Sequence, residues 1–257
     1  MKIKERLKNK ETVYGTFVKL NCPQIVEMLS FAGLDFIIID MEHSTISHEA
    51  AENLMRAAGD MDVIVRVPAA AEEHVLHALD AGASGVQVPG LQRASEAEQV
   101  VGWGKYFPMG GRGLSFAQRS ARYGFVDKDQ YIEEKNEESL FVFHIENKEM
   151  VEEIDRLCEN PQVDVLFIGP MDLSQSYGTP GNAGSEPVQK AIQTVMEAAK
   201  RHDKAVGIFA AQIGDIEKYK RQGIQYIAAA SDIGFCKAGA SEYMKTASAL
   251  QESAPGI

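Results

Sequence analysis

The sequence predicts an α/β fold, a closed (β/α)8 barrel, and two observations carry the prediction. Short apolar, β-branched runs alternate with longer amphipathic stretches along the whole chain. Runs of this kind, apolar on both faces, are typical of parallel strands covered by helices. The chain has 257 residues and no GxGxxG motif after its first expected strand, which favours the barrel over an open doubly wound sheet. One domain spanning residues 1–257 is expected.

Glycines mark several of the expected junctions. Gly33, Gly82 and Gly223 stand where a helix should end and a strand begin, which suits a left-handed residue at the helix end. The strands are expected at Tyr14–Val18, Phe36–Asp40, Val63–Val67, Gly85–Val88, Leu140–Glu146, Val163–Ile168, Ala205–Phe209 and Tyr226–Ala229. The helices are expected at Pro23–Ala32, Glu49–Gly59, Glu72–Ala81, Ser95–Lys105, Lys148–Glu159, Glu186–His202, Ile213–Gln222 and Gly234–Leu250.

One long irregular insert, Tyr106–Lys128, interrupts this rhythm. Its core, FPMGGRG, is too rich in glycine for a helix, and a loop this long inside a compact domain is usually functional. The segment around Arg112 is expected to form either an anion-binding loop or a surface lid. The last residues, ESAPGI, are expected to be frayed.

The composition limits the class of protein. The net charge of −11, without a basic stretch, argues against nucleic acid as a partner. Cys22, Cys158 and Cys236 are widely spaced and form no CxxC pair, which indicates a reduced, cytoplasmic protein. No apolar run approaches the length of a membrane span, so no membrane partner is expected.

Polar residues gather at the ends of the expected strands, where barrels of this kind carry their reactive groups. Because unpaired buried charge is costly, such a concentration indicates a functional site rather than a core. The residues are Asp40, Glu42, His43, Arg66, His144, Glu146 and Asp172.

Glu146 and Asp172 follow successive strands, and neighbouring strands lie about 4.8 Å apart. Two carboxylates there, with open positions for water and a 2-oxo acid, suit a hard ion such as Mg²⁺ or Mn²⁺. The alternative is that Glu146 caps the next helix and Asp172 begins a short turn.

Arg66 stands between two valines in a strand that should be buried. Its guanidinium must therefore find an anion, either a substrate oxyanion or a buried acid. His43, beside Asp40 and Glu42, is a candidate acid or base, although it would equally serve a loop carbonyl.

The segment Gly169–Ser174 should turn from a strand into a short helix, whose first N–H groups suit a substrate carboxylate. Lys19 is the one lysine near a strand end that suits a Schiff base, but no apolar pocket around it is evident to lower its pKa.

In order along the chain, these strand ends resemble the HpcH/HpaI family of class II pyruvate aldolases. The resemblance covers roughly residues 10–250, and six motifs in one order are more specific than any one of them. The matching segments are FIIIDMEH (36–43), VRVP (65–68), LDAGASGVQVP (79–89), YFPMGGRG (106–113), FHIEN (143–147) and FIGPMDLSQSYG (167–178).

The resemblance implies a barrel of the phosphoenolpyruvate/pyruvate type and a set of roles. Glu146 and Asp172 would hold a divalent metal, Mg²⁺ or Mn²⁺ before Co²⁺ or Zn²⁺. Arg66 would stabilise the keto oxygen as it becomes an enolate. The backbone around Gly169, Met171 and Asp172 would take the substrate carboxylate.

The resemblance further implies that His43 works in an acid–base relay with Asp80, surrounded by Asp40, Glu42 and His144. The chain departs from the family pattern at His144, where glutamine is usual. His144 would then lie close to the metal.

Two further departures are Met171, where a small residue is common, and Lys19, where many members carry glycine. The family also implies a homo-oligomer, commonly a hexamer, in which the last helix, here Gly234–Leu250, is exchanged between subunits.

The function expected from these residues and this resemblance is metal-dependent cleavage of 4-hydroxy-2-oxo acids to pyruvate and an aldehyde through an enolate. Two alternatives stay open. One is a citrate, acyl-CoA or oxaloacetate lyase using the same site. The other is a non-catalytic protein that binds 2-oxo acids.

Overall fold

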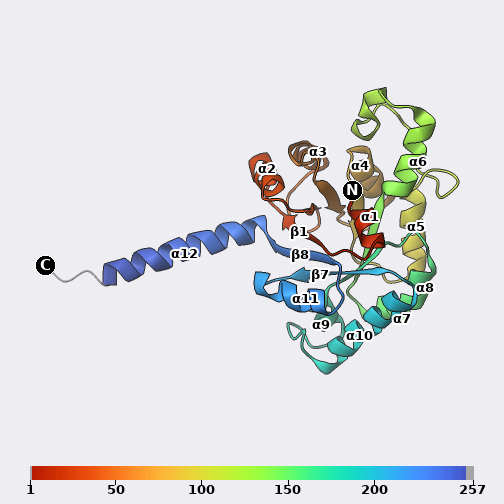
Figure 1. The fold of residues 1–257 in the computed structure, drawn as a ribbon. Helices are drawn as coiled ribbons and strands as arrows, with labels where there is room; N and C mark the ends of the chain where they lie inside the picture. Colours follow the sequence, from red (N-terminus) through yellow and green to blue (C-terminus); the bar gives the residue numbers. More distant parts are fainter. Residues whose placement is uncertain (1, 253–257) are drawn as a thin grey trace.

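The computed structural model describes residues 2–252, with side chains to residue 249, and contains a closed barrel of eight parallel strands (Figure 1). The strands follow one another around the barrel in sequence order, and β1 pairs with β8 to close it. They are β1 Val13–Val18, β2 Phe36–Asp40, β3 Asp62–Arg66, β4 Gly85–Val88, β5 Leu140–Ile145, β6 Val165–Ile168, β7 Ala205–Ala210 and β8 Tyr226–Ser231. The predicted fold class is confirmed, with each strand end within two residues of its expected place.

Most of the helices surround the strands on the outside of the barrel (Figure 1). The helices of the described chain are α1 Ile3–Lys8, α2 Pro23–Phe31, α3 His48–Ala57, α4 Glu72–Asp80, α5 Ala94–Gly104, α6 Lys128–Glu138, α7 Lys148–Glu152, α8 Ile154–Glu159, α9 Pro170–Ser176, α10 Glu186–Arg201, α11 Ile216–Arg221 and α12 Asp232–Glu252. Two 3₁₀ turns join them, η1 Arg119–Gly124 and η2 Ile213–Asp215. The helices expected at 148–159 and 213–222 are each divided in two.

The insert is more ordered than its sequence suggests. It contains η1 and leads into α6, and Tyr106, Ala121 and Tyr131 form a small buried cluster of their own. At the other end of the chain, α1 places Ile3 and Leu7 among the apolar residues that fill the barrel interior. The expectation of a frayed end falls mostly on residues 253–257, which lie outside the described part of the chain.

The strand register decides which side chains meet at the mouth of the barrel. Asp40, the last residue of β2, pairs with Arg66, the last residue of β3. On the other side, Ile145 pairs with Ile168 at the ends of β5 and β6, so the residues that follow these strands are also neighbours. Reactive residues predicted from separate strands are thereby brought to one end of the barrel.

The last helix, α12, projects away from the barrel instead of lying against it (Figure 1). Its side chains are largely exposed, among them the apolar Phe235, Tyr243 and Met244. Within residues 2–252, no helix is both long enough and apolar enough to span a membrane.

Candidate active site

Two carboxylates converge where β5 and β6 end. Glu146 directly follows β5, and Asp172 lies in the first turn of α9. A Cβ placed on Gly169, between them, would lie 3.4 Å from Oε2 of Glu146 and 3.5 Å from Oδ2 of Asp172. Glycine therefore leaves open the small space that both carboxylates border. Among the described residues, no hydrogen-bond or ion-pair partner is found for the Asp172 carboxylate.

The Glu146 carboxylate is held by a chain of buried polar groups. It accepts a hydrogen bond from the backbone N–H of Gly90 at 2.6 Å and one from Nδ1 of His144 at 2.8 Å. On the far side of the ring, Nε2 of His144 lies 2.7 Å from the Gln87 amide nitrogen, and the Tyr226 hydroxyl donates to the Gln87 amide oxygen at 3.3 Å. The amide nitrogen can only donate, so Nε2 of His144 accepts from it and Nδ1 carries the proton that faces Glu146.

This arrangement keeps Glu146 ionised. Burial alone would raise the pKa of Glu146, but the hydrogen bond and charge of His144, with the Gly90 N–H, lower it below its ordinary value. His144, the residue at which the chain departs from the family pattern, thus orients a carboxylate through one nitrogen and is itself oriented through the other. Such second partners commonly fix metal ligands in place.

The donor set fits a hard divalent cation. Carboxylate oxygens of Glu146 and Asp172 retain lone pairs directed at the space beside Gly169, and Mg²⁺ is usually bound by one or two carboxylates with water and substrate completing its shell. Within the described residues, no group of three His, Cys, Asp or Glu side chains is placed to enclose an ion, which differs from a closed structural zinc site. The alternative role for Glu146, a helix cap, is wrong, because α7 is capped by the side chain of Asn147.

Across the mouth, Arg66 has found buried acids within its own chain. Its Nε and Nη2 donate to the two oxygens of Asp40 at 2.9 and 2.6 Å, and its Nη1 lies 2.9 Å from Glu42. The guanidinium also lies over the Phe17 ring, 4.9 Å from its centre. Of its five N–H bonds, two are not used by these acids.

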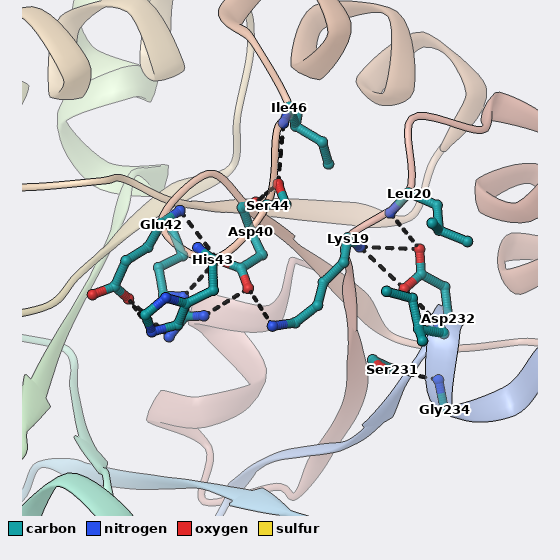
Figure 2. A network of polar contacts seen from close by, with 12 residues as sticks. Lys19, Leu20, Asp40, Glu42, His43, Ser44, Ile46, Ser231, Asp232 and Gly234 are labelled. Atoms are coloured by element: carbon teal, nitrogen blue, oxygen red, sulfur yellow. Dashed lines mark hydrogen bonds and ion pairs between the residues drawn. The ribbon is translucent and has the colours of Figure 1, made fainter. Parts of the chain in front are cut away.

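Asp40 is the centre of this network, which Figure 2 shows from close by. Besides Arg66, it accepts bonds from the backbone N–H groups of Glu42 and His43 and lies 3.0 Å from the Lys19 ammonium. Burial would raise the pKa of Asp40, but the Arg66 hydrogen bonds and charge, with the other donors, bring it down to about 2. For Glu42, burial prevails over the Arg66 charge, and its pKa is raised.

The predicted relay residues are not in contact within one chain. The His43 side chain is exposed, with its Nε2 3.8 Å from Glu42. Asp80, at the end of α4, pairs with Nη2 of Arg112 at 2.5 Å. Arg112 is almost fully buried over the Tyr106 ring, so its place in the glycine-rich insert serves an internal acid rather than an open anion loop.

A cavity of about 380 Å³ joins the two sides of the mouth. Its lining consists of Phe17, Lys19, Arg66, His144, Phe167, Ile168, Gly169, Pro170, Met171, Asp172, Phe209, Ser231 and Ile233. A larger cavity, of about 920 Å³, lies on the outer wall beside α10 and α11 and contains none of the predicted catalytic residues. The smaller cavity is therefore the candidate substrate site.

Fewer backbone N–H groups than predicted are free to bind a substrate carboxylate. The N–H of Gly169 already donates to the Ile145 carbonyl at 3.1 Å, so it is not available to a ligand. Gly169 matters instead for the space beside the two carboxylates. Met171 lies at the cavity rim with an exposed side chain.

Comparison with known proteins places the chain in one family. The model of the HpcH/HpaI aldolase/citrate lyase family matches residues 13–238. The chain is 33% identical to a 5-keto-4-deoxy-D-glucarate aldolase from Enterobacter sp. (strain 638), over 91% of each chain. It is 31% identical to a hydroxypyruvate/pyruvate aldolase from Paraburkholderia phytofirmans, over 90% of this chain and 91% of the relative.

A solved structure supports the same assignment. The crystal structure of an HpcH/HpaI aldolase/citrate lyase family protein from Burkholderia cenocepacia J2315 superposes with a TM-score of 0.90 at 29% identity, covering 95% of this chain and 98% of that one. The family match, the relatives and the barrel with its acids at the strand ends agree. The chain belongs to the HpcH/HpaI aldolase/citrate lyase family and is an aldolase, a carbon–carbon lyase.

Proposed function

We propose that this aldolase uses a divalent cation, Mg²⁺ or Mn²⁺, to cleave 4-hydroxy-2-oxo acids to pyruvate and an aldehyde. The observation that carries the proposal is the pair of carboxylates, Glu146 and Asp172, converging beside Gly169. Gly169 and Asp172 line a cavity that Arg66 also lines. One of the relatives is named a hydroxypyruvate/pyruvate aldolase, which supports a pyruvate-type substrate.

Glu146 and Asp172 would hold the cation. When bound, it supplies Lewis acidity at the keto oxygen of the substrate. The two free N–H bonds of Arg66 would donate to the same oxygen as negative charge develops on it. Met171 and Asp172, in the first turn of α9, would offer their backbone N–H groups to the carboxylate.

The reaction breaks the bond between C3 and C4. The C4 hydroxyl loses its proton to a base and becomes the aldehyde carbonyl, and the electron pair of the broken bond becomes the enolate of pyruvate, which is protonated at C3. We assign the proton transfer to His43, whose exposed ring stands at the mouth. Asp80 pairs with Arg112 in its own chain. A relay between His43 and Asp80, as the family resemblance implies, would therefore need the Asp80 of a neighbouring chain.

That requirement agrees with the projecting helix α12. Its exposed apolar side chains, including Phe235 and Met244, would be covered if neighbouring barrels exchanged this helix (Figure 1). We propose a homo-oligomer, a hexamer by the family resemblance. Light scattering coupled to gel filtration would test it, and a monomeric mass would contradict it.

The aldolase proposal is tested by measuring pyruvate release from a panel of 4-hydroxy-2-oxo acids, coupled to lactate dehydrogenase, with and without EDTA. Activity should fall to background in EDTA and return with added Mg²⁺ or Mn²⁺. Undiminished activity in EDTA would contradict the role of Glu146 and Asp172.

The family description also names citrate lyases, and a citrate, acyl-CoA or oxaloacetate lyase is the second candidate. Pyruvate release from none of the hydroxy-oxo acids, with cleavage of citrate or an acyl-CoA substrate instead, would favour it. The alternative of a non-catalytic binding protein is not favoured. His144, which stands where the family usually has glutamine, holds Glu146 in place by a hydrogen bond, and no metal ligand is lost.

A further inference from the structure

Lys19 gives the substrate cavity a second cation. It follows β1 at the mouth and lines the cavity of about 380 Å³, where Arg66 is the other cationic side chain. Its side chain is 28% exposed, and its ammonium lies 3.0 Å from Oδ2 of Asp40. Neither the metal-binding carboxylates nor the proposed proton transfer makes use of it.

The position of Lys19 is fixed by its backbone. The N–H groups of Lys19 and Leu20 donate to the Asp232 carboxylate at 3.0 and 2.8 Å. Asp232 is buried and begins α12. Figure 2 shows the Lys19 side chain extending from this anchor toward Asp40, so the ammonium is held at the cavity and not left to move with a free loop.

The ammonium has capacity to bind a further anion. Asp40, its one ion-pair partner within the described residues, already receives two bonds from Arg66 and two backbone N–H bonds. An ammonium has three N–H bonds, and the ion pair with Asp40 uses one. A substrate anion would therefore bind Lys19 without breaking a contact that the chain makes for itself.

The order of strands around the barrel says which part of a substrate reaches Lys19. If the 2-oxo acid half lies between Asp172 and Arg66, it occupies the cavity beside β3, β5 and β6. The remaining wall comes from the ends of β1, β7 and β8, where Lys19 and Ser231 are polar and Phe209 and Ile233 are apolar. The aldehyde half must extend toward this wall.

Resting on the proposed aldolase function, we propose that Lys19 binds a carboxylate on the aldehyde half of the substrate. A short apolar spacer between the reacting carbon and this carboxylate would lie against Phe209 and Ile233. Lys19 is a specificity-determining residue in this proposal, and the bond-breaking step does not depend on it.

The test compares two aldehydes of equal size as acceptors for pyruvate in the direction of synthesis, succinic semialdehyde and 4-methylpentanal. The first ends in a carboxylate and the second in an uncharged branch of the same shape. Wild-type kcat/KM should favour succinic semialdehyde, and Lys19→Met should reduce this preference about 10- to 100-fold, as expected for a hydrogen bond to a charged group. Lys19→Arg, which keeps the charge, should retain most of it.

The preference is the ratio of kcat/KM for the two aldehydes. A general loss of activity caused by disturbing Asp40 and Arg66 lowers both values equally and does not change this ratio. Lys148→Met, which removes an exposed lysine of α7 outside the cavity, is the matched control and should keep the wild-type ratio. An equal ratio in wild type and Lys19→Met overturns the role of Lys19.

Exchange of the methyl protons of pyruvate into D₂O by the wild-type enzyme needs no aldehyde, and it tests the proposed function separately. Exchange together with an unchanged ratio overturns only the role of Lys19. Absence of exchange, with no addition to either aldehyde, overturns the aldolase proposal and this inference with it.

Discussion

The two sides of the barrel mouth treat charge in opposite ways. On the side of β1–β3, Arg66 and Lys19 meet Asp40 and Glu42 within the chain. On the side of β5 and β6, Glu146 and Asp172 face a shared space, and within the described residues neither is paired with a lysine or an arginine. The contact that Glu146 makes with a basic side chain is the hydrogen bond from Nδ1 of His144.

Folding alone pairs the charges on the β1–β3 side, whereas the carboxylates beside β5 and β6 need a ligand to pair theirs. The Asp40–Arg66 network is finished when the strands pair, and it supports the fold as well as the cavity. The carboxylates of the other side are not paired with a lysine or arginine in the described part of the chain, so a cation from solution would complete that side. Substitutions on the two sides should therefore affect different properties.

The largest effect is expected from Glu146→Gln, which keeps the shape of the side chain and removes its charge. Loss of Lewis-acid assistance at the keto oxygen amounts to several kcal/mol, and kcat/KM for pyruvate release should fall by roughly 1,000-fold. Unfolding of the metal-free protein should become somewhat easier, because the lowered pKa of Glu146 means that the fold stabilises its ionised carboxylate. Titration with Mn²⁺ would measure the lost affinity.

Glu149→Gln provides the control for this substitution. It makes the same change on α7, three residues further along, where Glu149 lies near Lys148 at the surface. Wild-type Mn²⁺ affinity in the Glu146 variant would contradict the assignment of the metal side.

Arg66→Ala should combine two effects. One oxyanion donor is worth about 100- to 1,000-fold in rate, so pyruvate release should fall by this factor. From sequence alone this variant is expected to fold normally, but the structure changes that expectation, because Asp40 is left buried. Breaking a buried ion pair costs about 3–5 kcal/mol, and the lower end applies because Lys19 remains 3.0 Å from Asp40.

Urea unfolding in metal-free buffer would measure this loss, and Arg66→Lys is the comparison. A lysine keeps the positive charge beside Asp40 but not the two parallel bonds, so it should recover more stability than activity. An Arg66→Ala protein as stable as wild type would show that Asp40 does not depend on Arg66.

The sequence predicted which strand ends meet, because barrel geometry alone decides that outcome. Residues that end parallel strands must meet at one end, so the gathering of Glu146, Asp172 and Arg66 followed from their places in the chain. The sequence left open which anion Arg66 would find, because that depends on the register pairing Asp40 with Arg66.

Other features depend on contacts that no local pattern carries. Helix α6 was missed because its sequence is polar on nearly every side, with Tyr131 and Asn136 as its buried residues. The pairing of Asp80 with Arg112 joins a helix end to a glycine-rich loop 32 residues away. Such pairs are fixed by the packing of the whole fold, and their spacing in the sequence does not reveal them.

The smallest expected effect is the loss of stability that the Asp40 side of the mouth contributes when the pH is lowered. The pKa of Asp40 is about 2 in the folded chain and ordinarily 3.8, so it is lowered by folding. A lowered carboxyl pKa contributes stability that is complete above pH 4 and disappears as the pH falls through 2, here about 2 kcal/mol in all.

The protonated Asp40 of the wild type then resembles the neutral side chain of Asp40→Asn. The free energies of unfolding of these two proteins, measured with urea in metal-free buffer, should therefore differ most near pH 6 and approach one another toward pH 2. A difference that stays constant over this range would show that Asp40 is not the acid-sensitive part of the β1–β3 side.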